Sequence, residues 1–402
     1  MLTSLGHLSY CTNIHAGEEW KDHFAVLQEN IPLIKERLSW QKPFGIGLRL
    51  SNKASLSLAK EENLSAFKKW LHDNNCYVYT MNGFPYGGFH HQRVKDQVHA
   101  PDWTTNERLQ YTLRMFRILS ELLPEGMEGS ISTSPLSYKH WFAGDEDRQQ
   151  EAMEKGTWHM LEVAEQLVKV HRVTDTILHL DIEPEPDGLI GNGMEFLHWY
   201  LQCLLPMGVP LMMERFSVSR EQAEEMIRRH VRLCYDVCHF AIGYEDAQDM
   251  LSALREAKIA VGKLQLSAAL KADMPQDAGA RGPVKEAFQA FDEPTYLHQV
   301  IARCQDGRLL HYADLSDALQ DIENTSVAEW RAHFHVPLFL NQYGLLRSTQ
   351  EDVKAMLQWC REQKITEHLE VETYTWEVLP QEWQAPLAES ISRELAWVLR
   401  EI

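Results

Sequence analysis

The stretch Ile177-Leu178-His179-Leu180-Asp181-Ile182-Glu183-Pro184-Glu185-Pro186-Asp187 is the part of the sequence that decides the fold. Its first half is apolar and predicts a buried strand, and its second half places several carboxylates where that strand ends. Two later stretches repeat the arrangement, since Leu233–His239 ends in Asp-x-x-His and Leu369–Tyr374 carries two acids. Such charges are costly to desolvate unless a cation or a base compensates them. Acids at the carboxyl ends of several parallel strands are typical of the catalytic face of a (β/α)₈ barrel, so the sequence predicts a metal-centred barrel.

The order of the predicted elements supports this fold class. Apolar runs alternate with amphipathic helices, which predicts an α/β protein with a parallel sheet. Helices have clear start signals, such as Thr104-x-x-Glu107 and Ser219-x-x-Gln222. Nine strand candidates compete for the eight places of a barrel, so one of them, or the segment of about residues 273–324, must lie outside it. The candidates are residues 5–12, 44–50, 76–81, 127–133, 176–182, 233–237, 259–266, 333–340 and 368–374.

A single domain over residues 1–402 is expected, with one insertion after the seventh strand. The inserted segment, about residues 273–324, contains the Pro/Gly-rich loop Met274–Pro283 and a candidate hairpin around Asp306-Gly307. We interpret it as an elaborated loop on the catalytic face rather than as a separate domain.

The composition narrows the class of partner. The chain has 402 residues, of which 44% are hydrophobic and 10% aromatic, so it can bury a large core. Its formal net charge of -19 is the wrong sign for a phosphate backbone, which needs clustered Lys and Arg. We therefore expect a small-molecule metabolite as the partner and no nucleic acid.

The expected compartment is the cytoplasm. The seven cysteines are scattered without a CxxC pair, which fits reduced thiols rather than a disulfide framework. The segment Met1–Tyr10 lacks the basic and apolar regions of a signal peptide. No stretch is expected to approach the roughly 18 apolar residues of a membrane span, so direct membrane insertion is not expected.

Polar side chains at the ends of four predicted strands are the candidate metal ligands. A single acid at a strand end is commonly a helix cap or a surface group, but three acids on separate strands of one barrel favour a cation. Carboxylates completed by an amide or an imidazole suit Mn, Mg, Co or Zn. The candidate ligands are Glu183, Asp236, Gln265 and Glu372.

The candidate catalytic residues overlap with these ligands. Glu183 and Glu372 are expected to act as base and acid, and His239 follows Asp236 by three residues and can reach the substrate or bound water. Lys263 lies on the same inward face as Gln265 because side chains alternate along a strand. It either takes part in catalysis or simply pairs with a barrel carboxylate.

Two further segments are candidates for binding the substrate. The segment 332–337 places His333 and His335 on one face of a strand, where they are either ligands or hydrogen-bonded core groups, and His335 is expected nearer the site. The loop 81–91 combines Gly and Pro with aromatic side chains and suits a lid, with an ordinary packed loop as the alternative. Its apolar faces are Phe84, Tyr86 and Phe89, and Arg93 and Lys95 follow for an anionic group. The candidate substrate-binding residues are Asn82, Tyr86, His91 and His335.

At these residues the chain resembles the xylose-isomerase-like barrel superfamily, which includes sugar isomerases, ketose epimerases and a DNA-repair endonuclease branch. The resemblance implies a divalent metal held by acids from strands five, six and eight and usually by a His from strand seven. Glu183, Asp236 and Glu372 match the acids, and Asp236-x-x-His239 matches a recurrent pattern of the family. Gln265 stands where the family usually has His.

The resemblance is closer to one bacterial branch, the EboE metabolite traffic proteins encoded in ebo gene clusters. It implies a role near the export of secondary-metabolite precursors, with other ebo-cluster proteins as partners, but no particular reaction. Six dispersed strings carry it across the chain: 7–15, 82–87, 129–133, 262–267, 333–338 and 369–376.

Three functions remain open from the sequence. The first is a metal-dependent isomerase or epimerase that acts on a small polyol, sugar or cyclitol-like metabolite. The second is a metal-dependent hydrolase or lyase in which His239 or His335 moves the proton. The third is a carrier that binds a metabolite without converting it. A DNA endonuclease ranks behind these because of the negative charge of the chain.

Overall fold

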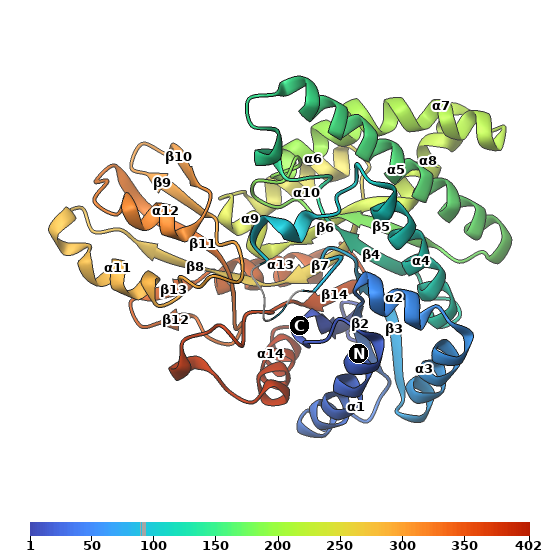
Figure 1. Ribbon diagram of the computed structural model, residues 1–402, viewed down its shortest axis with the longest axis horizontal. Helices are drawn as coiled ribbons and strands as arrows, with labels where there is room; N and C mark the ends of the chain where they lie inside the picture. Colours follow the sequence, from blue (N-terminus) through green and yellow to red (C-terminus); the bar gives the residue numbers. More distant parts are fainter. Residues whose placement is uncertain (89, 91–93) are drawn as a thin grey trace.

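A parallel barrel forms the centre of the molecule in the computed structural model, which describes residues 1–88, 90 and 94–402 (Figure 1). Its eight strands pair in the order β1-β14-β7-β6-β5-β4-β3-β2, and a parallel bridge between Cys11 and Gly47 joins β1 to β2. The predicted (β/α)₈ barrel is therefore confirmed. The strands are β1 (His7–Tyr10), β2 (Phe44–Arg49), β3 (Cys76–Asn82), β4 (Gly129–Thr133), β5 (Leu178–Ile182), β6 (Val231–Asp236), β7 (Val261–Leu266) and β14 (His368–Val371).

Helices connect the strands and cover the outside of the barrel (Figure 1). Ser219 and Gln222 form the predicted capping box of α8, whereas α4 is capped by Thr105, one residue after the predicted Thr104. Thr104 instead donates its hydroxyl to Asp102. The helices are α1 (Trp20–Arg37), α2 (Asn52–Leu58), α3 (Glu61–Asp73), α4 (Asn106–Leu122), α5 (Glu146–Thr174), α6 (Gly193–Trp199), α7 (Leu205–Phe216), α8 (Arg220–His230), α9 (Val237–Ile242), α10 (Ala247–Glu256), α13 (Gln350–Glu362) and α14 (Leu387–Glu401).

The insertion after β7 is larger than predicted and contains its own antiparallel sheet, which extends from the barrel at the left of Figure 1. Six strands pair in the order β10-β9-β11-β8-β13-β12. The surplus strand candidate at 333–340 belongs to this sheet as the end of β11, and the predicted hairpin is the pair β9 and β10, with Gly307 in the turn at φ 86°. The inserted elements are β8 (Ala268–Asp273), α11 (Gly282–Gln289), β9 (Val300–Cys304), β10 (Leu309–Tyr312), α12 (Leu315–Gln320), β11 (Val327–Val336), β12 (Gln342–Tyr343) and β13 (Leu346–Ser348).

Polar groups fill part of the barrel interior below its mouth. Lys263 and Glu370 are fully buried and form an ion pair. Glycine makes room for the carboxylates: a Cβ on Gly47 would come within 1.8 Å of Glu370 Oε1, and one on Gly262 within 2.0 Å of Asp181 Oδ1. The small residues on β2 and β7 therefore allow charged side chains to cross a narrow barrel.

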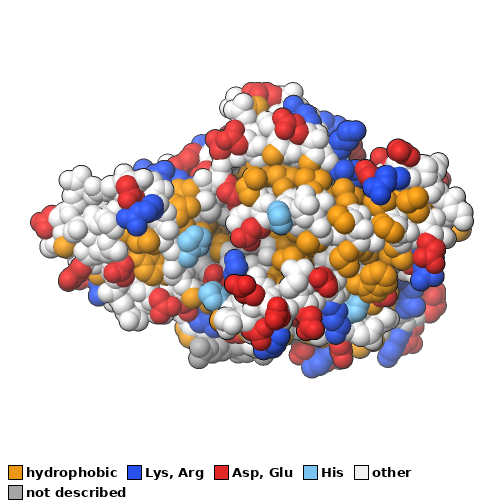
Figure 2. Space-filling model, turned by 90° about the horizontal axis from the view of Figure 1, so that it is seen from above, with side chains coloured by type: hydrophobic (Ala, Val, Ile, Leu, Met, Phe, Trp, Pro, Cys, Tyr) orange, Lys and Arg blue, Asp and Glu red, His pale blue; other side chains and the backbone are white. Residues whose placement is uncertain are grey.

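The sequence analysis expected no stretch with the length and apolar composition of a membrane span, and one helical stretch shows that this expectation was wrong. Residues Gly193–Phe216, which comprise α6, a π-helical turn and α7, are long and apolar enough to cross a membrane by length and composition alone. Within the most apolar part of this stretch 56% is buried inside the molecule, as in a core helix of a globular protein. The exposed remainder includes Met194 and Met213, and Figure 2, seen from above, shows hydrophobic side chains gathered in patches on the upper face.

Candidate metal centre

Three carboxylates converge at the mouth of the barrel, where strands five, six and eight end. Glu183 follows β5, Asp236 is the last residue of β6, and Glu372 follows β14. One oxygen atom from each lies within 4.8 Å of the others, and the three residues are at most 4% exposed. These distances are those of groups that can share one cation, since each ligand needs about 2 to 2.6 Å.

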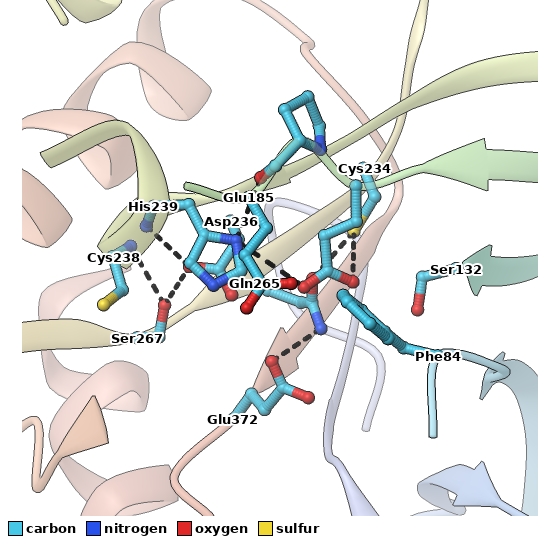
Figure 3. A network of polar contacts seen from close by, with 12 residues as sticks. Phe84, Ser132, Glu185, Cys234, Asp236, Cys238, His239, Gln265, Ser267 and Glu372 are labelled. Atoms are coloured by element: carbon cyan, nitrogen blue, oxygen red, sulfur yellow. Dashed lines mark hydrogen bonds and ion pairs between the residues drawn. The ribbon is translucent and has the colours of Figure 1, made fainter. Parts of the chain in front are cut away.

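Amide groups surround Glu372 and orient its carboxylate. Asn13 and Asn82 each donate an amide N–H to Glu372 Oε1 at 2.8 Å. Gln265 donates to Oε2 at 2.7 Å, as Figure 3 shows. Gln265 Oε1 faces the thiol of Cys234, with an S···O distance of 2.8 Å. Gln265 thus joins the predicted cluster, but in this arrangement it positions Glu372 and does not direct its own oxygen toward the other carboxylates.

One carboxylate oxygen of Asp236 accepts hydrogen bonds, and the other has no hydrogen-bond partner among the described residues. Oδ1 accepts hydrogen bonds from the hydroxyl of Ser267 at 2.6 Å and from the backbone N–H of His239 at 3.2 Å, so Asp236 also caps α9 (Figure 3). Oδ2 is buried and has no hydrogen-bond partner among the described residues. An oriented, buried oxygen without a donor is what a cation ligand requires, because an uncompensated buried charge is unfavourable.

The pKa values of two of the three acids are raised, whereas that of Asp236 is lowered, because His239, His335 and the hydroxyl of Ser267 outweigh the effect of its burial. Burial raises the pKa of Glu183 well above its usual range, and the neighbouring Glu372 and Asp236 raise it further. Burial likewise raises the pKa of Glu372, with additional repulsion from Asp236. Three adjacent buried carboxylates therefore need either protons or a cation to coexist.

Three histidines line the other side of the site, and each ring is oriented by a carbonyl group. His239 Nδ1 lies 3.0 Å from the backbone oxygen of Pro184, and His335 Nδ1 lies 2.8 Å from that of Glu372. His333 Nδ1 lies 2.7 Å from Gln299 Oε1. His333 and His335 come from β11, so the insertion brings both imidazoles to the barrel mouth rather than only the expected His335.

The residues fit a divalent cation. The carboxylates offer oxygen, the imidazoles offer nitrogen, and both are ligand types of Mn, Co and Zn. His335 Nε2, like Asp236 Oδ2, is buried without a hydrogen-bond partner in the described part of the chain. Groups that combine these residues, such as Asp236 with His239 and His335, also have ligand atoms within 4.8 Å of one another.

A pocket opens to solvent beside these groups. Glu183, Glu372 and the three histidines belong to its wall. Apolar side chains complete it from two directions: Phe84 and Pro85 come from the loop after β3, and Tyr374 comes from the chain after β14. The wall of the pocket combines apolar faces with a few polar groups, as metabolite sites do.

Some of the predicted substrate-binding residues line the pocket and others do not. Asn82 and His335 line the pocket. Tyr86 does not: its ring packs against Tyr111 at 5.0 Å between centroids, and the guanidinium of Arg108 lies over it. Lys95 reaches the pocket wall but pairs with Asp314 at 2.5 Å. The remaining predicted residues, His91, Phe89 and Arg93, lie outside the described residues.

Lys263 pairs with a barrel carboxylate, which is one of the two roles predicted for it. Its ammonium pairs with Glu370 and donates to Ser132 Oγ at 3.2 Å. Both charged groups are fully buried, and Lys263 is not part of the pocket wall. A side chain that is committed to a buried ion pair below the site has no described path to a substrate.

Sequence reasoning missed Asn13 and Glu185 as members of the site. Asn13 follows β1 and Glu185 follows β5, so both stand where parallel strands deliver side chains to the barrel mouth. The rule that singled out Glu183 would have found them if it had been applied to every polar residue after a strand.

Comparisons with known proteins assign no family to the chain. No protein-family model matches the chain, and no curated protein matches it. Similar solved structures include the IolI protein with a bound zinc atom, at 12% identity over 98% of this chain and 97% of that chain, with a TM-score of 0.46. Another is D-psicose 3-epimerase in the presence of D-fructose, at 10% identity over 97% of each chain and a TM-score of 0.47. A xylose isomerase domain protein from Alicyclobacillus acidocaldarius subsp. acidocaldarius has 10% identity over 98% of each chain and a TM-score of 0.44. These are likenesses of fold, and neither metal nor substrate is inferred from them.

Proposed function

We propose that this protein is a divalent-cation-dependent enzyme that isomerises or epimerises a small polyol, sugar or cyclitol-like metabolite. One observation carries the proposal: Glu183, Asp236 and Glu372 converge in a buried cluster, and Asp236 Oδ2 has no hydrogen-bond partner in the described part of the chain. Glu183 and Glu372 line a pocket whose wall also carries apolar side chains.

The residues of the chain support proton transfer. A bound Mn, Mg, Co or Zn ion supplies a Lewis acid for a carbonyl or hydroxyl oxygen of the substrate. Glu183 and Glu372 come from strands that β6 and β7 separate, so they can approach a substrate from different directions and move a proton. The amides of Asn13 and Asn82 hold Glu372 for this role, and Phe84 and Tyr374 give the pocket wall apolar faces.

We also propose a substrate class and partners for this protein. The six sequence strings that resemble the EboE branch support a substrate among secondary-metabolite precursors, and other ebo-cluster proteins as partners. The net charge of -19 supports a metabolite rather than a nucleic acid as the ligand.

A second candidate function is a metal-dependent hydrolase or lyase. The observation in its favour is the three buried histidines beside the carboxylates, because burial lowers the pKa of each imidazole and so keeps it neutral and able to accept a proton from water. The two functions differ in whether solvent hydrogen enters the substrate at carbon or a bond of the substrate is broken.

Metal analysis combined with hydrogen exchange tests the proposal. Glu183→Ala and Asp236→Ala should each remove the ion bound by the carboxylates from the folded protein, whereas Glu151→Ala, an exposed acid on α5, should not. Wild type incubated in deuterium oxide with a panel of polyols and sugars should incorporate deuterium at carbon, and Glu372→Gln should not. Full metal content in both alanine variants would contradict the metal site, and binding without any exchange or cleavage would indicate a carrier.

A further inference from the structure

Two imidazole nitrogens face each other beside the carboxylate cluster. His239 Nε2, on α9, lies 3.1 Å from His333 Nε2, on β11. Both histidines are buried, at 6% and 3% exposure. The pair joins the barrel to the insertion, and the carboxylate site described above does not require it.

The neighbours of the two rings determine where their hydrogens lie. A carbonyl oxygen only accepts, so His239 Nδ1 must carry a hydrogen toward Pro184. Gln299 donates its amide N–H to the carbonyl of Pro186 at 3.0 Å, which turns its Oε1 toward His333. His333 Nδ1, 2.7 Å from this oxygen, must therefore also carry a hydrogen. In the neutral rings, each Nε2 atom then carries a lone pair without a hydrogen, and the two nitrogens lie 3.1 Å apart.

Two lone pairs this close repel each other, and a positive charge between the rings would remove the repulsion. A shared proton is one solution and a metal ion is the other. The surroundings favour the ion, because Glu185 Oε2, Asp236 Oδ2 and His335 Nε2 are also buried without hydrogen-bond partners among the described residues, and one proton cannot satisfy them all. A 3.1 Å separation is close to the edge of about 3.3 Å expected between two nitrogens that each lie about 2.0 to 2.1 Å from one tetrahedral zinc.

We propose that His239, His333 and Glu185 bind a second metal ion next to the one assigned to Glu183, Asp236 and Glu372. These three residues offer ligand atoms within 4.8 Å of one another. Two imidazoles and one carboxylate select zinc or cobalt over magnesium. The Nδ1 hydrogen bonds to carbonyl groups fix the ring orientation and make Nε2 a better ligand. The site stands whether or not the proposed isomerase activity does.

Metal stoichiometry with zinc and cobalt tests the second site. Chelator-treated protein is dialysed against each ion, and the bound metal is counted after removal of loosely held ions. We expect wild type to bind one more ion per chain than His333→Gln, whereas the exposed His198→Gln should match wild type. Glu183→Ala should keep the histidine-bound ion, and its X-ray absorption should show two imidazole ligands.

The outcomes separate this proposal from the preceding one. Equal metal content in wild type and His333→Gln would overturn the second site and indicate a shared proton. If wild type binds both ions but incorporates no deuterium into any substrate, the proposed activity is contradicted and the second metal site is not. If His333→Gln does not fold, a cobalt titration of wild type decides: two phases, one with the intense visible bands of tetrahedral cobalt, support the site, and a single phase overturns it.

Discussion

At the scale of single residues, the hydrogen bonds around Glu372 explain how one carboxylate is prepared for its role. Asn13 and Asn82 donate to the same oxygen at 2.8 Å, and Gln265 donates to the other. Asn13 follows β1 and Asn82 ends β3, and these two strands lie on either side of β2. A carboxylate fixed in this way loses little freedom when it binds a cation, which favours tight binding.

We expect Asn82→Ala to weaken cation binding by about tenfold to a hundredfold, as removal of a partner that orients a metal ligand commonly does. The protein should remain folded because β3 pairs through its backbone, and the Asn82 side chain contributes one hydrogen bond to Glu372 and accepts one from the backbone N–H of Phe84. Competition with a chelator of known affinity measures the change. Asn30→Ala removes a hydrogen bond from a side-chain amide to the backbone oxygen of Val26 within α1. It serves as the control and should leave the affinity for the cation unaltered. Equal affinities for Asn82→Ala and wild type would show that the amide does not orient Glu372.

At the scale of elements, the last helix is tied to the barrel mouth by a buried acid. Glu394 on α14 is 2% exposed and accepts hydrogen bonds from the backbone N–H of Leu338 at 3.0 Å and the hydroxyl of Thr373 at 2.7 Å. It thereby joins the helix to the end of β11 and to the chain after β14. Burial raises the pKa of Glu394 to about 7, against its ordinary value of 4.5.

The stability of the fold should therefore fall as the pH rises from about 4.5 to about 7. In this range the folded protein keeps the proton on Glu394 and the unfolded chain has lost it, so the folded state binds more protons and is weakened by rising pH. The loss is complete above the folded pKa and is on the order of 3 kcal/mol. Glu394→Gln should remove it, because the amide keeps the accepting oxygen and cannot ionise.

Urea unfolding at pH 4.5 and pH 8, with a chelator present, measures this difference. The variant and wild type should have similar stability at the lower pH, and the variant should be the more stable at the higher pH. Parallel pH profiles for the two proteins would show that Glu394 is not the group responsible.

At the scale of the whole molecule, the site exists only when distant parts of the chain come together. Three barrel strands supply the carboxylates, α9 supplies His239, and the inserted sheet supplies His333 and His335. The unfolded chain spreads these groups over residues 183–372 and cannot bind one ion with them in the same geometry. Metal binding should therefore stabilise the folded state by mass action.

We expect zinc or manganese at a hundredfold excess over its dissociation constant to stabilise the protein by about 3 kcal/mol per site. Thermal unfolding with metal and with a chelator measures the shift in Tm. The double variant Glu183→Ala/His333→Gln, which lacks a ligand at each proposed site, should show no metal-dependent shift. A shift of the same size in the double variant would mean that the ion binds elsewhere.

The local pattern of the sequence was sufficient to predict the barrel and its three acids. Alternating apolar runs and amphipathic helices specify a parallel sheet, and parallel strands deliver whatever follows them to one common face. Glu183, Asp236 and Glu372 could be placed by this rule alone, as could the inward row of Lys263 and Gln265. Their roles as metal ligands remain predictions.

Only the tertiary structure decided the rest. The strand ending at Val336 was read as a barrel candidate, because an apolar run carries no signal of the sheet it will join, and long-range pairing with β8 and β9 places it in the insertion. The same pairing brings His333 to 3.1 Å from His239, which lies 94 residues earlier in the chain. Likewise Tyr86 turned toward Tyr111 and Lys263 toward Glu370 because packing and buried charge select partners by distance in space, which spacing along the sequence does not encode.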